Sequence, residues 1–311
     1  MTNMVKEKKA YKQDFTWGKF KKQFPFHLLL VPAIVYVIIF QYIPLYGVVI
    51  AFQKYSPNTL FHSPWVGLDN FRYIFKLPGF SRTIINTLYI AILKIIGNLS
   101  IPILFSLMLN EVRTKWFKKV AQTFVYLPHF ISWVIMAGII QDLFDRSGVI
   151  NQFIVAMGGQ SISFLGDIKW FPLTIVFTDV WKNFGFNTIV YLAALTGIDP
   201  TLYEAAAIDG AGRWKQTLHV TLPGMMPIVI LKMTLSLGEV LHAGFDQVFN
   251  LYSPIVYQTG DIIDTFVFRL GMEQAQYSAA TAVGLFKSLI SLVLIGVSYY
   301  LADKKAGYTI F

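Results

Sequence analysis

The sequence predicts an all-α integral membrane protein with six transmembrane helices and both termini in the cytoplasm. Composition is the first reason: 55% of the 311 residues are hydrophobic and 14% are charged, whereas soluble domains carry roughly 25% charged residues. Mean hydropathy is accordingly high, at +0.54. The second reason is that the apolar residues gather in six blocks, and the third is that Lys and Arg concentrate in alternate connections between them.

Each apolar block is long enough to cross a bilayer as a helix, which requires about 20 residues. The blocks cover residues 26–52, 84–109, 120–144, 170–196, 222–249 and 278–301. Because the connections are short, we expect six separate spans. The chain then divides into an N-terminal tail, a six-span domain and a C-terminal tail, over residues 1–25, 26–303 and 304–311.

The distribution of basic residues sets the orientation. If the N-terminus is inside, the cytoplasmic segments hold more Lys and Arg than the outer ones, as the positive-inside rule requires. This orientation places residues 198–221 in the cytoplasm. The outer segments, over residues 54–82, 145–169 and 250–276, either receive a partner from outside or serve as connectors with interfacial aromatics.

Several function classes are excluded by what the sequence lacks. The net charge of +9 comes from basic residues at the ends of apolar blocks, which argues for membrane topology and against a nucleic-acid partner. Without Cys there are no disulfides or thiolate sites. P-loop, H-E-x-x-H and G-x-S-x-G motifs are absent, and the five His residues are too scattered for a metal cluster. We therefore expect no catalytic residues, no metal site and no cofactor bound by this chain.

A polar stretch between the fourth and fifth blocks carries helix-start and helix-stop signals. Asp199 followed by Pro200 is a typical N-cap and first helical residue. The pattern predicts a short helix over residues 202–207, ended by Gly210 and Gly212. From spacing alone, this helix is either a docking element or an ordinary capped loop helix.

Polar side chains recur at helical spacing in two neighbouring blocks. Positions i, i+3, i+4 and i+7 share one face of a helix, and ionisable groups deep in a span are candidates for a functional site. In the fourth block these positions hold Asp179, Lys182, Asn183 and Phe186, and in the fifth block they hold Glu239, His242, Ala243 and Asp246.

Four charged residues lie at about half depth in the predicted spans: Asp179, Lys182, Glu239 and Lys287. They either line one polar cavity or pair with one another to hold helices together. Aromatic residues beside the stripes would suit stacking on a sugar ring, although any single one of them is more often a packing residue than a contact. Lys94 and Lys232 are isolated, and the sequence indicates no role for them.

The stretch from Glu204 to Pro227 resembles the EAA signature of permease subunits in binding-protein-dependent ABC importers. That signature is Glu-Ala-Ala, a Gly after three residues, and a branched apolar residue before Leu-Pro. The matching residues are Glu204, Ala205, Ala206, Gly210, Val220, Leu222 and Pro223, with Asp209 and Ala211 beside the Gly. Val220 replaces the usual Ile. The segment 67–71 further resembles carbohydrate-type permeases of this group, and the segments 244–250 and 257–265 resemble their LplB-like branch.

This resemblance implies a type I importer permease fold in the plasma membrane of a bacterium. It implies a second homologous permease, as a heterodimer, and two cytoplasmic ATPase subunits that bind ATP and Mg. An extracellular solute-binding lipoprotein would deliver oligosaccharides or polysaccharide fragments. The ATPases would dock on residues 198–221, with coupling through Glu204, Ala205, Ala206, Asp209, Gly210 and Ala211.

The resemblance also implies that sugar contacts come from the spans on either side of this loop. In maltose-type relatives, the corresponding positions fall on or beside the two polar stripes, although the side chains here are more charged. The competing interpretation is an ion-coupled secondary transporter, in which the intramembrane Asp, Glu and Lys residues relay protons.

Overall fold

The computed structural model describes residues 17–59 and 62–306, and every regular element in these ranges is a helix. Strand-like pairing within them is limited to an isolated bridge between Gln53 and Trp65. The chain divides into two compact units, Met1–Val49 and Ile50–Phe311. The predicted all-α fold is therefore confirmed for the described residues.

The first unit is an apolar helical rod. It contains α1 (Trp17–Val37), the π-helical turn η1 (Ile38–Tyr42) and α2 (Ile43–Leu45), and the 3-10 segment η2 (Tyr46–Phe52) follows. The stretch Phe24–Phe52 has a mean hydropathy of 2.3 and buries none of its most apolar window. A helix that is apolar on all sides suits a membrane environment.

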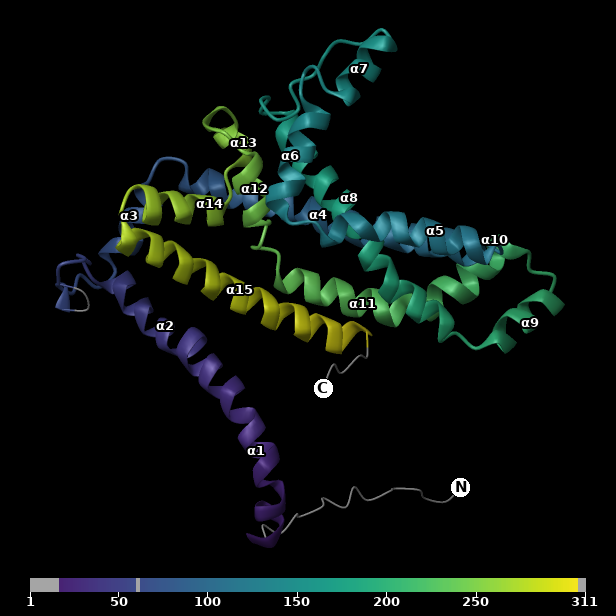
Figure 1. Ribbon diagram of the computed structural model, residues 1–311, viewed down its shortest axis with the longest axis horizontal. Helices are drawn as coiled ribbons and strands as arrows, with labels where there is room; N and C mark the ends of the chain where they lie inside the picture. The colour runs from purple at the N-terminus through teal and green to yellow at the C-terminus, as the bar shows by residue number, and fades with distance from the viewer. Residues whose placement is uncertain (1–16, 60–61, 307–311) are drawn as a thin grey trace. The chain divides into compact units, whose positions relative to one another are not determined.

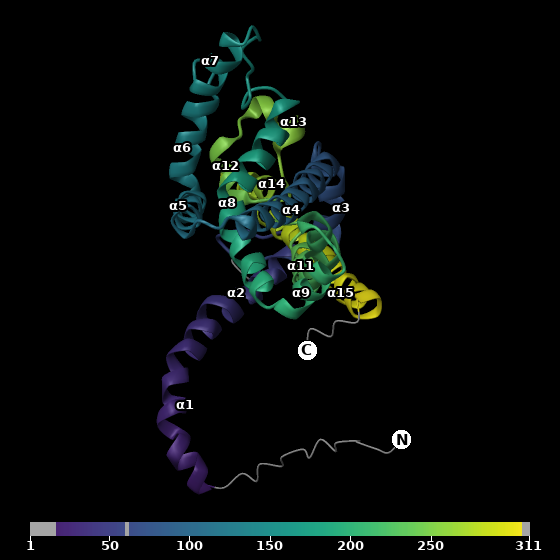
Figure 2. The same ribbon diagram turned by 90° about the vertical axis from the view of Figure 1, so that its right-hand side faces the viewer.

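The second unit is built around long helices that pack side by side (Figure 1). α4 (Phe80–Glu111) packs along α8 (Trp170–Thr196), and α11 (Leu222–Gly238) packs against both of these and against α15 (Tyr277–Ala306). Figure 2 shows the unit from the side, with α11 nearly end on. Shorter helices complete the unit: α3 (Asp69–Lys76), α5 (Lys115–Tyr126), η4 (Leu127–Phe130), α6 (Trp133–Phe144), α7 (Val149–Ala156), α9 (Pro200–Ile208), α10 (Arg213–Gln216), η5 (Thr217–Thr221), α12 (Phe245–Leu251), η6 (Pro254–Val256), α13 (Tyr257–Gly260), α14 (Ile263–Phe268) and η7 (Arg269–Glu273).

Four helices in the described part of the chain are long and apolar enough to cross a membrane. They are Phe24–Phe52, Phe80–Glu111, Arg213–Gly238 and Tyr277–Tyr300. A bent pair, Lys115–Phe130 with Trp133–Ala156, raises the number to five if it counts as one span. α8 has the predicted bounds over residues 170–196, but it is more polar and does not belong to this set.

The third apolar block is not one straight helix, which corrects the expectation for residues 120–144. α5 leads into η4, and the chain then turns through 108° before α6 begins. Pro128 has no N–H for a continuing α-helix. Ser132 begins the next helix as its N-cap, since its Oγ accepts a hydrogen bond from the Ile135 N–H at 3.4 Å.

The fifth apolar block is also broken, which corrects the expectation of one helix over residues 222–249. α11 ends at Gly238 and α12 starts at Phe245, with a turn between them. Gly244 has φ +92°, a left-handed conformation that L side chains rarely adopt and that stops a right-handed helix. The predicted stripe from Glu239 to Asp246 therefore does not lie on one helical face.

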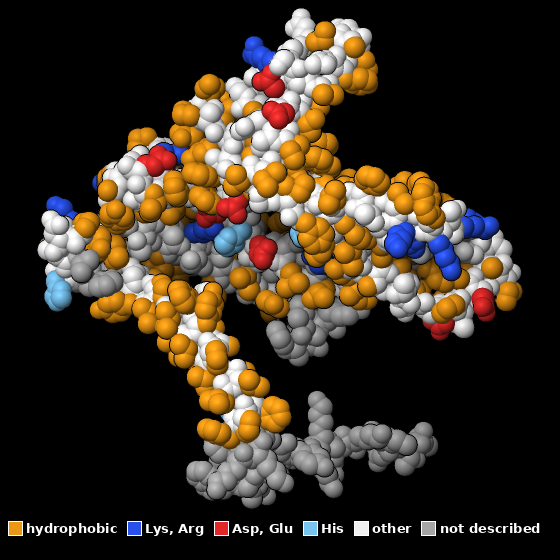
Figure 3. Space-filling view, in the orientation of Figure 1, with side chains coloured by type: hydrophobic (Ala, Val, Ile, Leu, Met, Phe, Trp, Pro, Cys, Tyr) orange, Lys and Arg blue, Asp and Glu red, His pale blue; other side chains and the backbone are white. Residues whose placement is uncertain are grey.

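The core lies where α4, α8, α12, α14 and α15 meet. Its fully buried side chains include Ile90, Phe171, Ile175, Val248 and Val283. Outside this core, much of the surface of the long helices is hydrophobic, and Figure 3 shows charged and His side chains gathered in a hollow between α12 and α11. The fold thus brings polar groups together inside an apolar unit.

Candidate functional site

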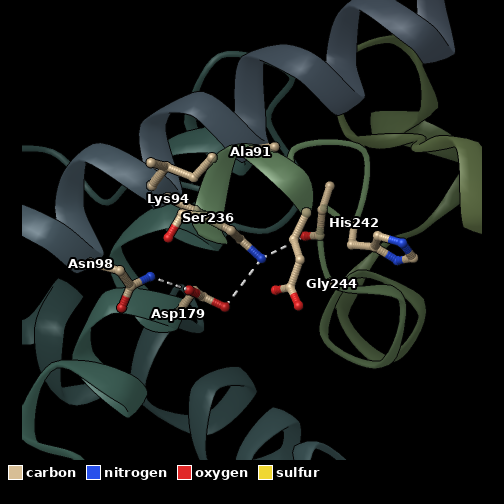
Figure 4. A pocket seen from close by; sticks show the side chains of 10 residues that line it. Ala91, Lys94, Asn98, Asp179, Ser236, His242 and Gly244 are labelled. Atoms are coloured by element: carbon tan, nitrogen blue, oxygen red, sulfur yellow. Dashed lines mark hydrogen bonds and ion pairs between the residues drawn. The ribbon is translucent and has the colours of Figure 1, made fainter. Parts of the chain in front are cut away.

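A polar cavity of about 190 Å³ lies where α4 and α8 pass the break between α11 and α12. It is the hollow that the charged residues occupy, seen closely in Figure 4. Charged, amide, hydroxyl and imidazole groups meet there with a few apolar ones. The lining consists of Ala91, Lys94, Ile95, Asn98, Asp179, Ser236, Glu239, His242, Ala243 and Gly244.

Lys94 is the centre of the polar network on one wall of this cavity. It extends from α4, and its side chain is almost completely buried. Its Nζ donates to the Ala243 carbonyl at 2.7 Å and to Gln247 Oε1 at 2.5 Å, and lies 3.3 Å from Asp179 Oδ1. A lysine ammonium has three donors and no acceptor, so these three oxygens use its full hydrogen-bonding capacity.

Asp179 is held from two sides. Besides the ion pair with Lys94, its Oδ2 accepts a hydrogen bond from Asn98 Nδ2 at 2.8 Å, and Figure 4 shows both partners pointing toward it. Asn98 Oδ1 in turn accepts from Asn187 Nδ2 at 3.2 Å. These contacts fix α4 against α8 and leave the Asp179 carboxylate at the edge of the cavity.

Gln247 ties the start of α12 to the same network. It accepts from Lys94, and its Nε2 donates to the Ile175 carbonyl and to Thr178 Oγ1, both at 2.8 Å. Gln247 is fully buried, and these hydrogen bonds give both polar atoms of its amide a partner, as is usual for buried polar groups. The break between α11 and α12 is therefore fastened to α4 and α8 by side chains.

Glu239 and His242 differ from these buried groups because both are exposed. Within the described chain, the Glu239 side chain has no hydrogen bond or ion pair, and it lines the cavity. His242 Nδ1 lies 3.4 Å from Lys287 Nζ, and that ammonium donates to Asp264 Oδ1 at 2.5 Å. Glu239 is therefore the charged lining residue most available to a ligand.

The structure separates the predicted stripe on α8. Asp179 reaches the cavity, but Lys182, Asn183 and Phe186 face the bend between α5 and α6. Asn183 Oδ1 lies 3.1 Å from His129 Nδ1, and the Phe186 ring stacks on the His129 ring with centroids 4.0 Å apart. This part of the stripe contacts the bend and does not line the cavity.

Lys182 satisfies the backbone at that bend. Its buried Nζ donates to the carbonyls of Pro128, His129 and Ile131, at 3.0, 2.7 and 2.7 Å. The carbonyls of His129 and Ile131 lie where η4 ends, so helical hydrogen bonds no longer satisfy them. The Pro128 carbonyl also accepts from the Ile131 N–H, at 3.3 Å. Lys182 thus acts at the bend as Lys94 acts at the break before α12.

Replacing Lys182 with Met should strongly destabilise the protein. The carbonyls of His129 and Ile131 would lose their donor, and a buried polar group without a partner costs about 1–3 kcal/mol. The measurement is the thermal unfolding midpoint of the purified protein in detergent. Lys232→Met in α11 is the matched control, because Lys232 makes no hydrogen bond or ion pair with the described residues. Equal stability of the two variants would contradict a role for Lys182 at the bend.

The remaining predicted residues fall in different places. Ala243 lines the cavity and offers its carbonyl to Lys94, whereas Asp246 is exposed on α12 outside the lining. Lys287 pairs with Asp264 and is also outside the lining. Of the predicted half-depth group, only Asp179 and Glu239 meet at the cavity. Searching the described residues for three His, Asp or Glu side chains that could hold a metal ion finds no such group.

Sequence reasoning missed Lys94 and Asn98. The available signal was their spacing, because residues four apart share a helical face and a lysine and an amide in an apolar block form a short polar stripe. Their partners, the Ala243 carbonyl and Asp179, are far away in the sequence. Spacing therefore identified a polar face but not what it contacts.

The second candidate element is α9, which begins and ends close to the predicted bounds. Asp199 Oδ1 accepts from the Thr201 N–H at 2.9 Å, and these hydrogen bonds hold the pKa of Asp199 below its usual value. At the other end, Gly210 has φ +75° and the Ala211 N–H donates to the Ala206 carbonyl at 2.8 Å, as in a Schellman motif.

The surface of α9 is open. Glu204, Ala205 and Asp209 are exposed, and Ile208 has 86% of its surface exposed. The Glu204 side chain has no hydrogen bond or ion pair with any described residue. Arg213 attaches the 198–221 loop to the end of α4, since its Nη1 lies 3.2 Å from Glu111 Oε2. Within the loop, Tyr203 Oη lies 3.0 Å from Thr221 Oγ1.

Loss of the Asp199 cap should loosen the start of α9. Asp199→Ala removes the acceptor for the Thr201 N–H, whereas Asp199→Asn keeps an equally good cap. We expect faster amide hydrogen exchange in residues 200–204 of the Ala variant only. Because the pKa of Asp199 is lowered in the folded state, its charged carboxylate stabilises the start of α9 fully at pH values above the unfolded pKa of about 3.9. This stabilisation is lost as the pH falls through the folded pKa. Equal exchange in both variants at neutral pH would contradict this role.

Comparison with known proteins gives matches along most of the chain. The family described as "Binding-protein-dependent transport system inner membrane component" matches residues 98–307. "Protein LplB" of Bacillus subtilis (strain 168) is 43% identical over 280 residues, which cover 89% of this chain and 88% of that protein. The "Polygalacturonan/rhamnogalacturonan transport system permease protein YteP" of the same organism is 41% identical over 280 residues, with 89% and 87% covered.

Solved structures are similar over the same extent. A chain of "a bacterial ABC transporter involved in the import of the acidic polysaccharide alginate" has a TM-score of 0.86 and 37% identity, covering 93% of this chain and 98% of that one. A second structure, of the alginate transporter "in complex with alginate pentasaccharide-bound periplasmic protein", has a TM-score of 0.85 at 37% identity, with 93% and 97% covered.

Proposed function

Because this chain belongs to the family of binding-protein-dependent transport system inner membrane components, we propose that it is the permease subunit of an importer of oligosaccharides or polysaccharide fragments. The observation that carries the proposal is the match over residues 98–307, which contains α9 and most of the cavity lining. The chain is a transport subunit and not an enzyme. We place it in the plasma membrane of a bacterium, with six spans and both termini in the cytoplasm.

Two lines of support favour a saccharide. The similar proteins include a permease named for polygalacturonan and rhamnogalacturonan and a transporter of alginate. The cavity offers a free carboxylate at Glu239, a hydroxyl at Ser236 and an imidazole at His242. Carboxylates and hydroxyls are good hydrogen-bond partners for sugar hydroxyls.

The partners of the chain belong to the same proposal. We assign two cytoplasmic ATPase subunits to the 198–221 loop, and ATP and Mg to those subunits. A second homologous permease would complete the pathway as a heterodimer, and an extracellular solute-binding lipoprotein would deliver the saccharide. A solved structure that contains a periplasmic protein with the similar transporter supports the last assignment.

Coupling follows from the position of α9 in the chain. It joins α8 and α11, and each of these helices leads to one side of the cavity, through Asp179 and through Glu239 (Figure 1). A force on α9 from closing ATPases would therefore act on both walls. Alternating access results if the two walls move relative to each other, opening the cavity first to one side and then to the other.

Reconstitution in liposomes tests this function. The complex is purified with its ATPases and second permease, and a saccharide panel is screened on the binding protein. We expect uptake that requires both ATP and the binding protein and persists when ionophores collapse the proton and sodium gradients. Uptake without ATP that ionophores abolish would instead establish an ion-coupled transporter.

A further inference from the structure

The break between α11 and α12 builds a site for a small cation. Three oxygens of different kinds converge there: the Ala243 carbonyl, the Gln247 side-chain amide and the Asp179 carboxylate. Carbonyls freed where a helix unwinds, together with a carboxylate, form the type of site that binds monovalent cations in membrane transporters. The oxygens belong to α8, α12 and the break, so a cation among them links separate parts of the unit.

In this protein the cation at that point is an amino group of the chain itself. Lys94 Nζ lies 2.7 Å from the Ala243 carbonyl oxygen, 2.5 Å from Gln247 Oε1 and 3.3 Å from Asp179 Oδ1. The number of acceptors equals the number of ammonium donors. With 7% of its surface exposed, Lys94 has almost no contact with solvent, and its charge is balanced by Asp179.

We propose that Lys94 is a tethered cation, which permanently fills a monovalent-cation site at the helix break. The chain requires positive charge at this point, and it supplies that charge covalently instead of binding a free ion. The ammonium is then withheld from the transported saccharide, because all three of its donors are used. This inference concerns the folded chain itself and does not depend on the identity of the substrate.

The size and access of the site define what could replace the side chain. A Cβ atom on Gly244 would lie 2.9 Å from Lys94 Nζ, so the site is closely bounded on that side. Lys94 also lines the cavity, so removing its side chain would open a channel from the cavity to the three oxygens. A primary alkylammonium ion could enter by this route, whereas a quaternary ion could neither fit nor donate.

Chemical rescue provides the test. The complete complex is purified with Lys94→Ala or Lys94→Met, and its thermal unfolding midpoint is measured in choline chloride. Choline is then replaced by propylammonium chloride at constant ionic strength. Propylammonium matches the atoms that the Ala substitution removes. We expect propylammonium to recover at least half of the loss in midpoint for Lys94→Ala. The Lys94→Met variant should not recover, because its uncharged side chain fills the channel.

Two further variants make the result decisive. Adding Asp179→Asn to Lys94→Ala should abolish the rescue, since the carboxylate that attracts the cation is gone. Lys94→Gln serves as a second variant if Lys94→Ala does not fold, and it should be less stable than wild type because it supplies donors without charge. Rescue of all variants alike, or wild-type stability of Lys94→Met, would overturn the proposal. Because stability is the readout, a failure here is distinct from a failure of ATP-driven uptake.

Discussion

Replacing Glu204 with Lys is expected to abolish ATP-driven uptake while the protein still inserts and folds. Glu204 lies exposed on α9, and its side chain makes no hydrogen bond or ion pair within the described chain. Replacing this side chain therefore breaks no internal hydrogen bond or ion pair, and a loss of function in the folded protein reports a contact with a partner. Reversing the charge turns an attraction for a basic or polar group on the ATPase into a repulsion, which costs several kcal/mol at an interface.

The design separates coupling from folding. Uptake and ATP hydrolysis are measured in liposomes that contain the complete complex, and subunit content is measured in the membrane. Glu273→Lys is the matched control, because it makes the same charge change at an exposed residue of η7, on the predicted outer side. We expect the control to transport normally, whereas Glu204→Lys hydrolyses ATP without uptake or loses its ATPases. Normal uptake by Glu204→Lys would remove α9 from the coupling mechanism.

The part of α9 that could be predicted is the part encoded locally. An N-cap, a Pro at the first helical position and a left-handed Gly at the end act over a few residues, so Asp199, Pro200 and Gly210 sufficed to place the helix. The bounds of α8 were also predicted, because an apolar block between polar loops has clear limits. These elements depend on composition and on short-range hydrogen bonds.

The two helix breaks could not be predicted in the same way. Each break lies inside one of the apolar blocks, at residues 127–132 and 239–244, and hydropathy carries no information about a bend. Each break is stabilised by a lysine from a neighbouring helix, Lys182 in one case and Lys94 in the other. The donors and acceptors are more than 50 residues apart, so neither local spacing nor periodicity could connect them.

The breaks also explain why the polar stripes were interpreted only in part. A lysine at half depth in a span suggests a cavity. However, Lys94 and Lys182 both donate hydrogen bonds to backbone carbonyls, which the N–H groups of a continuous helix would otherwise satisfy. Irregular backbone at membrane depth is tolerated where it lines a cavity or is buried in protein. The charges at the cavity and the breaks in the helices are therefore two aspects of one arrangement, in which cations stabilise the unwound backbone and carboxylates face the cavity.

Removing the carboxylate of Glu239 should abolish or severely reduce uptake without destabilising the protein. The side chain is exposed, faces the cavity and has no described partner. Loss of a hydrogen bond to a charged group costs about 1.5–3 kcal/mol, which corresponds to roughly a tenfold to hundredfold loss of affinity. In Glu239→Ala we expect the apparent KM for the saccharide to rise by this factor, while the binding protein still stimulates ATP hydrolysis.

Asp179→Ala is the comparison for Glu239→Ala, because Asp179 lines the same cavity but is bound to Lys94 and Asn98. Asp179→Ala would leave the Lys94 ammonium without its counter-ion, and breaking a buried ion pair costs about 3–5 kcal/mol. We therefore expect Asp179→Ala to lower the thermal unfolding midpoint and uptake together. Glu239→Ala should lower uptake alone. If uptake survives in Glu239→Ala, the cavity carboxylate does not contact the saccharide, and the charges of this unit serve to hold its broken helices together.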